Sequence, residues 1–146
     1  MSQRKGKRLI VSQSLSLNFQ KLCVQNQPRK KPANHESKLQ QACVKWFRLQ
    51  FRDVIIFSIP NGGSRHQKEV SKIKAEGVLA GVSDLFIMKA SRGFHGLFIE
   101  MKYGKNTTTE AQNNFLEKAK KERFATAVCY SFEEFVKITT QYLKSK

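Results

Sequence analysis

The chain has 146 residues, a length that suits one domain with a short tail and argues against a multi-domain assembly or an array of repeats. It carries 27 lysines and arginines against 11 acidic residues, a net charge of +16, which predicts a polyanionic partner such as nucleic acid. Hydrophobic residues make up 40% of the chain, enough for a packed core, and this excludes a basic protein that is disordered throughout.

The cysteines and the hydropathy predict an intracellular protein. Cys23, Cys43 and Cys129 are odd in number and far apart, which argues against a disulfide framework or a cysteine zinc site and fits a reducing compartment. No segment approaches the ~18 apolar residues of a membrane span. We expect the protein in the cytoplasm or with the nucleoid, without a membrane partner. Residues 1–33 are basic, contain serine and lack acidic side chains, so an organelle transit peptide stays open.

Residues 1–33 are predicted to form a basic N-terminal arm in front of a domain at 34–146. The arm holds eight basic residues and no acidic one, so it contributes half of the net charge. Residues 14–19 alternate between polar and apolar, which allows a short strand that augments a sheet. An extended arm held to DNA by its charge is the favoured interpretation, because an isolated strand is marginally stable.

The domain begins with a predicted helix that Asn34 caps and that runs to about residue 50. Its apolar residues fall at helical spacing and form one stripe: Leu39, Ala42, Cys43, Trp46 and Phe47. A buried strand is predicted over 54–59 and a tight loop at 60–63. A polar helix follows from about residue 66 to 76, and Gly77 closes it.

The second half predicts a hairpin, a helix, a strand and a last helix. Residues 84–88 and 96–101 are strand-like, and the seven residues between them include Gly93. A capping-box pattern at 109–112 opens a helix to about residue 122, a strand follows over 124–129, and Ser131 caps the last helix. The order α-β-α-β-β-α-β-α implies an α/β or α+β sandwich with a mixed sheet, antiparallel at the hairpin and joined by a helical crossover to its final strand.

Two carboxylates adjoin the strands of the predicted hairpin. If the hairpin is centred on Arg92, Asp84 lies directly opposite Glu100, and Lys102 shares the face of Glu100 because side chains alternate along a strand. Facing carboxylates repel, so either one takes up a proton or a cation lies between them. Oxygen ligands without a Cys or His cluster suit Mg²⁺ or Mn²⁺.

Two further side chains belong to this predicted site. Lys102 would lie beside the metal, where it could orient the attacking water or stabilise charge on a phosphate. Glu36 lies on the inward stripe of the first helix, and a carboxylate that faces the core there needs a partner.

These residues resemble the VRR-NUC family of the PD-(D/E)XK nuclease superfamily. Residues 81–84, Gly-Val-Ser-Asp, followed by Glu100-Met101-Lys102, are similar to the D…E-x-K signature of the superfamily. The features that narrow the resemblance to the family are Glu36, Asn61-Gly62-Gly63, Gly77, Gly81 and Gln112. The match covers roughly residues 34–131. Ser83 stands where proline is usual, and Glu122-Arg123 occupies a turn where glycine is common.

The resemblance implies a restriction-endonuclease-like α/β core and Mg²⁺-dependent hydrolysis of DNA phosphodiester bonds, with Mn²⁺ as a substitute. It implies that Asp84, Glu100 and the Met101 carbonyl bind the metal, with support from Glu36 directly or through water. Lys102 and Gln112 would position water and phosphate. Stand-alone members resemble homodimeric resolvases, so we expect a homodimer that acts on branched DNA such as the four-way Holliday junction, in DNA repair or recombination.

The predicted DNA-binding residues fall into two groups. Contact of Asn61, Gly62 and Gly63 with DNA follows from the resemblance. Six basic residues are expected to cluster near the mouth of the site: Arg65, Lys68, Lys72, Lys74, Lys89 and Arg92. No sequence-reading element is apparent, which favours recognition of DNA shape. Two alternatives stay open, a non-catalytic nucleic-acid-binding module and a restriction-type nuclease that cuts linear duplex at defined sites.

Overall fold

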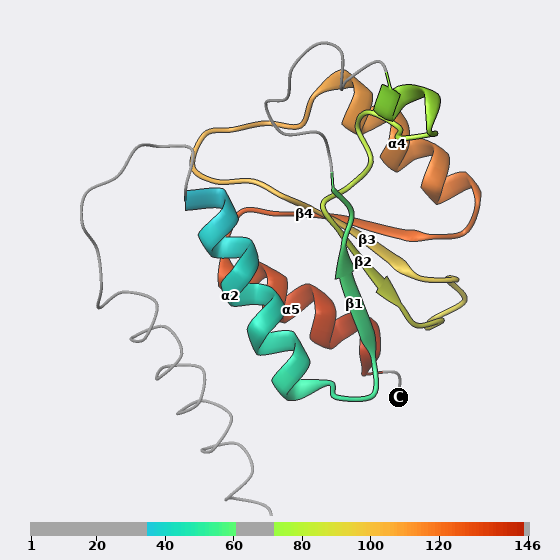
Figure 1. Ribbon diagram of the computed structural model, residues 1–146. Coiled ribbons are helices and arrows are strands. Elements are labelled where there is room, and N and C mark those ends of the chain that lie inside the picture. Colours follow the sequence, from blue (N-terminus) through green and yellow to red (C-terminus); the bar gives the residue numbers. More distant parts are fainter. Residues whose placement is uncertain (1–34, 61–71, 145–146) are drawn as a thin grey trace, which may run out of the picture. The chain divides into compact units, whose positions relative to one another are not determined.

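The computed structural model describes residues 35–60 and 72–144, which form a four-stranded sheet with helices on both faces (Figure 1). The helices are α2 (His35–Gln50), α4 (Glu110–Lys121) and α5 (Phe132–Leu143). The strands are β1 (Ile55–Ser58), β2 (Leu85–Met88), β3 (Leu97–Met101) and β4 (Ala125–Cys129). Residues 72–75 are also helical and represent the described end of the helix expected over 66–76. The predicted order of elements and the α/β class are confirmed.

The sheet is mixed, with the strand order β1-β2-β3-β4. The pairs β1–β2 and β2–β3 are antiparallel, whereas β3 and β4 are parallel. Parallel neighbours need a crossover between them, and α4 supplies it. The predicted antiparallel hairpin and helical crossover are therefore both present.

A two-residue turn lies at the tip of the connection between β2 and β3. Ser91 and Phe94 exchange both backbone hydrogen bonds, at 3.0 and 2.9 Å, around Arg92 and Gly93. These two central residues have positive φ angles of 52° and 81°, as a type I′ hairpin turn requires. Glycine adopts this conformation without strain, so the expectation from Gly93 of a hairpin here is confirmed.

The main core lies between the sheet and the pair α2 and α5, which run side by side (Figure 1). Trp46 and Phe47 of α2 both pack edge-on against Phe135 of α5, with ring centroids 6.3 Å apart in each pair. The buried stripe of α2 is the predicted one, with Cys43, Trp46 and Phe47 at its centre. Because both rings are buried, neither serves as a surface platform for stacked bases.

The opposite face of the sheet carries phenylalanines and is covered in part by α4. Phe98 of β3 packs against Phe115 of α4, with ring centroids 5.0 Å apart, and against Phe86 of β2, with ring centroids 4.5 Å apart. Since side chains alternate along a strand, the two neighbours of Phe98, Leu97 and Ile99, point to the α2 and α5 side, and both are buried. The same alternation sends Glu100 to the α4 side.

The two described cysteines lie in the interior of the domain. Cys43 and Cys129 are both buried and no disulfide joins them, and burial raises the pKa of Cys129 to about 12. Cys23 lies outside the described residues, as does the whole predicted arm. Within the described part of the chain, no helix has the length and apolar character to cross a membrane.

Candidate active site

The register of the hairpin brings the two predicted carboxylates together. Leu85 pairs with Ile99, and the same register continued by one residue places Asp84 opposite Glu100. The hairpin accommodates this register although its turn is centred between Arg92 and Gly93, because β2 has one more residue than β3 between the last strand pair and the turn. The predicted juxtaposition of Asp84 and Glu100 therefore holds.

Asp84 is anchored to strands on both sides. Its Oδ2 accepts a hydrogen bond from the backbone N–H of Met101 at 2.9 Å, and its backbone carbonyl accepts one from Ile59 at 2.9 Å. The Asp84 carboxylate is thus held at the end of β3, next to Met101, whose carbonyl is expected to bind metal.

Glu100 has two oxygens in different surroundings. Oε1 accepts hydrogen bonds from the Lys102 ammonium, at 2.9 Å, and from the Gln112 side-chain amide. Oε2 is buried without any hydrogen-bond partner in the described residues, although the side chain is only 1% exposed. Burial, helped by the negative charge of Asp84 and opposed by the Lys102 hydrogen bond, raises the pKa of Glu100 to about 7.

Lys102 lies at the centre of the charges. Burial by itself lowers the pKa of its ammonium, but the hydrogen bond to Glu100 and the negative charges of Glu100, Glu36 and Asp84 outweigh it and raise the pKa above the ordinary lysine value. The ammonium therefore stays protonated at neutral pH. It is a fixed positive charge beside two carboxylates.

Glu36 reaches this site from the start of α2. The preceding residue, His35, stacks on Tyr103 with ring centroids 5.0 Å apart and planes 12° from parallel, which joins the first turn of α2 to the segment after Lys102. The half-buried Glu36 interacts with Lys102 through charge. Sequence analysis placed Glu36 on the inward-facing stripe of the first helix. It did not predict that His35 stacks on Tyr103, the contact that brings this helix turn to the site.

Gln112 connects α4 to the site. Its Oε1 accepts from the Thr109 backbone N–H at 2.8 Å while the Thr109 hydroxyl accepts from the Gln112 N–H at 3.3 Å, a complete capping box. The other end of the amide donates to Glu100. The same side chain therefore caps the helix and holds a catalytic candidate, whereas the resemblance implied that it positions water and phosphate.

The segment before Asp84 packs closely against the start of α4. Gly81 has a φ of +85°, and a Cβ atom there would lie 2.5 Å from the backbone carbon of Ala111. No other residue fits this approach, which accounts for the glycine in the motif. Ser83, in place of the usual proline, is fully buried, and its hydroxyl has no hydrogen-bond partner within the described residues.

The donor set suits a hard cation. Across residues 35–60 and 72–144, no three His, Cys, Asp or Glu side chains are grouped so as to hold a metal by themselves. A metal between Asp84 and Glu100 would thus need further oxygen ligands, such as a main-chain carbonyl, water or phosphate. The buried Glu100 Oε2 without a partner is the observation that fits such an ion, because an unpaired buried carboxylate oxygen is costly.

Two of the predicted DNA-binding residues lie away from the site. Lys89 follows β2 and Arg92 is in the turn, whereas Asp84 precedes β2, so the length of the strand separates them from the carboxylates. The expectation that they line the mouth of the site is wrong, since an antiparallel hairpin places its turn at the far end. The Arg92 guanidinium instead donates to the Lys144 carbonyl at 3.1 Å.

The remaining predicted DNA contacts divide into described and undescribed residues. Lys72 and Lys74 are exposed, and Lys72 forms a loose ion pair with Glu76 at 3.8 Å. The other members lie outside the described residues: Asn61, Gly62, Gly63, Arg65 and Lys68.

Comparison with known proteins gives one family. Residues 27–133 match the family described as the VRR-NUC domain. A solved structure described as a VRR_NUC domain protein is 30% identical in sequence, superposes with a TM-score of 0.65, and aligns with 75% of this chain and 88% of its own. No curated protein matches.

Proposed function

Because the chain belongs to the VRR-NUC family, whose domains are of the PD-(D/E)XK nuclease type, we propose that it is a Mg²⁺-dependent endonuclease that hydrolyses DNA phosphodiester bonds. We also propose that it acts as a homodimer on branched DNA such as four-way junctions. The net charge of +16 supports a DNA substrate. The lack of a predicted sequence-reading element supports recognition of DNA shape.

The single observation that carries the proposal is the buried, unpaired Oε2 of Glu100 opposite Asp84. Asp84, Glu100 and the Met101 carbonyl would hold Mg²⁺, and Glu36 would support the ion through water. When bound, Mg²⁺ supplies Lewis-acid polarisation of a phosphoryl oxygen and lowers the pKa of water.

The protein groups then have distinct roles. The protonated Lys102 donates to a phosphate oxygen or orients the nucleophilic water, because its ammonium has donors left beyond the hydrogen bond to Glu100. Gln112 holds Oε1 of Glu100, so that the carboxylate keeps Oε2 directed away from its hydrogen-bonded side. The Met101 N–H fixes Asp84 in the same way. The two carboxylates are thus positioned before any substrate binds.

A cleavage assay tests the proposal. Labelled four-way junction, flap and linear duplex DNA are incubated with Mg²⁺ or EDTA and with the native protein, Asp84→Ala or the matched control Asp53→Ala. Asp53 is an exposed aspartate that also precedes a strand but has no carboxylate partner in the proposed site. We expect junction cleavage by the native protein and Asp53→Ala with Mg²⁺, and loss of at least about a hundredfold in rate for Asp84→Ala.

Other patterns point to other functions. DNA that is bound but intact in every lane indicates a binding module, and cleavage of linear duplex at defined sites indicates a restriction-type enzyme. The homodimer is tested by light scattering after size exclusion, with an expected mass of twice the 16.8 kDa of the chain. A monomer under cleavage conditions contradicts the proposed dimer and leaves the nuclease proposal intact.

A further inference from the structure

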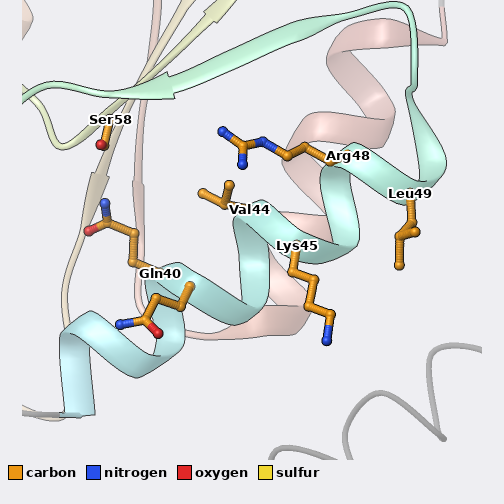
Figure 2. Close-up of a pocket in the computed structure, with 7 residues that line it drawn as sticks. Gln40, Val44, Lys45, Arg48, Leu49 and Ser58 are labelled. Carbon is orange, nitrogen blue, oxygen red and sulfur yellow. The ribbon is translucent and has the colours of Figure 1, made fainter.

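A pocket lies between α2 and β1, on the part of α2 beyond Glu36 (Figure 2). Its polar lining is Gln40, Gln41, Lys45 and Arg48 from the helix and Ser58 from the strand. Two of these side chains are cationic and none is acidic. The pocket is therefore suited to an anion, and sequence analysis did not single out any of its residues as a site.

Several of the polar groups in the pocket have no partner among the residues that the structure describes. Within the described residues, the side chains of Gln40, Arg48 and Ser58 form no hydrogen bond or ion pair. In Figure 2, Val44 and Arg48 extend from α2 toward β1, where Ser58 lies near the end of the strand. The Arg48 guanidinium, the Gln40 amide and the Ser58 hydroxyl can thus all donate hydrogen bonds to a ligand in this pocket. A phosphodiester is an anion that accepts several hydrogen bonds at once.

One row of residues on α2 connects the pocket to Glu36 of the candidate active site. Glu36, Gln40, Val44 and Arg48 are four residues apart in turn, so they form an i, i+4 row on α2. The twelve residues from Glu36 to Arg48 rise about 18 Å along the helix axis. At about 3.4 Å per nucleotide along one strand, this span corresponds to roughly five nucleotides.

We propose that the α2–β1 pocket binds backbone phosphates of the substrate DNA a few nucleotides from the bond that is cut. The inference rests on the proposed function, because it takes DNA as the substrate and the Asp84–Glu100 site as the place of cleavage. Gln40 and Ser58 donate neutral hydrogen bonds, and Arg48 supplies the charge. The contacts are to phosphate, so the pocket contributes affinity and direction of the strand without reading sequence.

The test measures DNA binding without cleavage. Fluorescein-labelled four-way junction and linear duplex are titrated in EDTA with the full chain, Arg48→Ala, Arg48→Glu and the control Arg52→Ala, over a series of salt concentrations. Arg52 is also exposed and lies just beyond α2, but it does not line the pocket. Arg52→Ala therefore removes the same charge as Arg48→Ala without changing the pocket. Circular dichroism establishes that each variant is folded.

We expect Arg48→Ala to weaken binding about three- to tenfold and to lower the slope of log K against log salt by about 0.9 relative to the native chain. Arg48→Glu is expected to weaken it further, and Arg52→Ala by less than about twofold. Equal affinities and salt slopes for Arg48→Ala and Arg52→Ala would overturn the proposal that this pocket binds phosphate, whatever the cleavage assay shows. If the native protein cuts no DNA but binding still depends on Arg48, the nuclease proposal fails and the phosphate pocket stands.

Discussion

At the scale of single residues, Glu100 combines deep burial with an uneven set of hydrogen bonds. Its side chain is 1% exposed, one oxygen has two donors and the other has none, and burial raises its pKa to about 7. A carboxylate buried at this cost is stabilised either by a proton or by a cation. If the proposed Mg²⁺ binds at Oε2, the ion and the proton would compete for this oxygen near neutral pH.

The stability of the metal-free protein is therefore expected to depend on pH through Glu100. Between the ordinary value of 4.5 and about 7, the folded protein holds a proton that the unfolded chain has released. Stability then falls as pH rises through this window, by at most about 3 kcal/mol. Urea unfolding in EDTA should show this fall in the native protein and not in Glu100→Gln, which has no proton to release.

If the stability of the native protein and that of Glu100→Gln change with pH in the same way, the buried proton is not on Glu100. Added Mg²⁺ provides a second readout on the native protein alone. Under the proposed function the ion would replace the proton, so the stabilisation by Mg²⁺ is expected to be larger at pH 8 than at pH 5. Equal stabilisation at both pH values contradicts competition between the ion and the proton.

At the scale of secondary structure, the start of α4 couples helix formation to site geometry. Gln112 caps α4 through its carbonyl oxygen and holds Glu100 through its amide nitrogen. Gly81 lets the chain before Asp84 approach the first turn of the same helix. One helix terminus thus positions both carboxylates.

Two substitutions at Gln112 are predicted to separate these roles. Gln112→Glu keeps an acceptor for the Thr109 N–H, so the capping box survives, but it places a carboxylate against Glu100. We expect Gln112→Glu to retain the cap and to lose at least about tenfold in DNA cleavage, because the added charge raises the pKa of Glu100 further. Gln112→Ala loses the cap as well, at a cost of about 1 kcal/mol.

The measurements are urea unfolding and single-turnover cleavage as a function of pH. For Gln112→Glu, the pH at which cleavage reaches half its maximum is expected to move upward. If Gln112→Glu cleaves DNA at neutral pH at the rate of the native protein, the contact between Gln112 and Glu100 does not matter to the reaction.

At the scale of the whole molecule, charge is the dominant property. Eight of the 27 basic residues lie in residues 1–33 without any acid, and the rest are distributed over the domain. Lys89 and Arg92 are at the far end of the hairpin from Asp84, so the basic surface is not confined to the active site. A substrate that contacts both regions has to be larger than one phosphodiester.

The basic arm is predicted to contribute to DNA affinity through specific phosphate contacts. Replacing Arg4, Lys5, Lys7 and Arg8 with glutamine in the full chain should weaken binding and lower the salt slope by up to about 0.9 for each residue that contacts a phosphate. The control replaces four exposed lysines of the domain, which removes the same charge: Lys105, Lys118, Lys121 and Lys137. Anisotropy titrations over a salt series measure both variants. Equal effects would mean that net charge alone matters.

Properties that depend on short-range pattern were predictable from the sequence. The α2 stripe and the capping box at Thr109 follow from spacing that each segment contains within itself, and the mixed sheet follows from the order of the elements along the chain. The alignment of Asp84 with Glu100 was also predicted, but from a turn centred on Arg92; in the structure the turn is centred between Arg92 and Gly93, and an extra residue on the β2 side gives the same register. The resemblance to the VRR-NUC family rested on the same residues, and the family is confirmed.

Only the tertiary structure decided how those elements meet. It placed Gln112 on Glu100 rather than in solvent, brought the start of α2 to Lys102, and left one oxygen of Glu100 buried without a partner. It also placed Lys89 and Arg92 away from the site. Burial and contacts between distant segments depend on the packing of whole helices on the sheet, and this packing is absent from the local periodicity of the sequence.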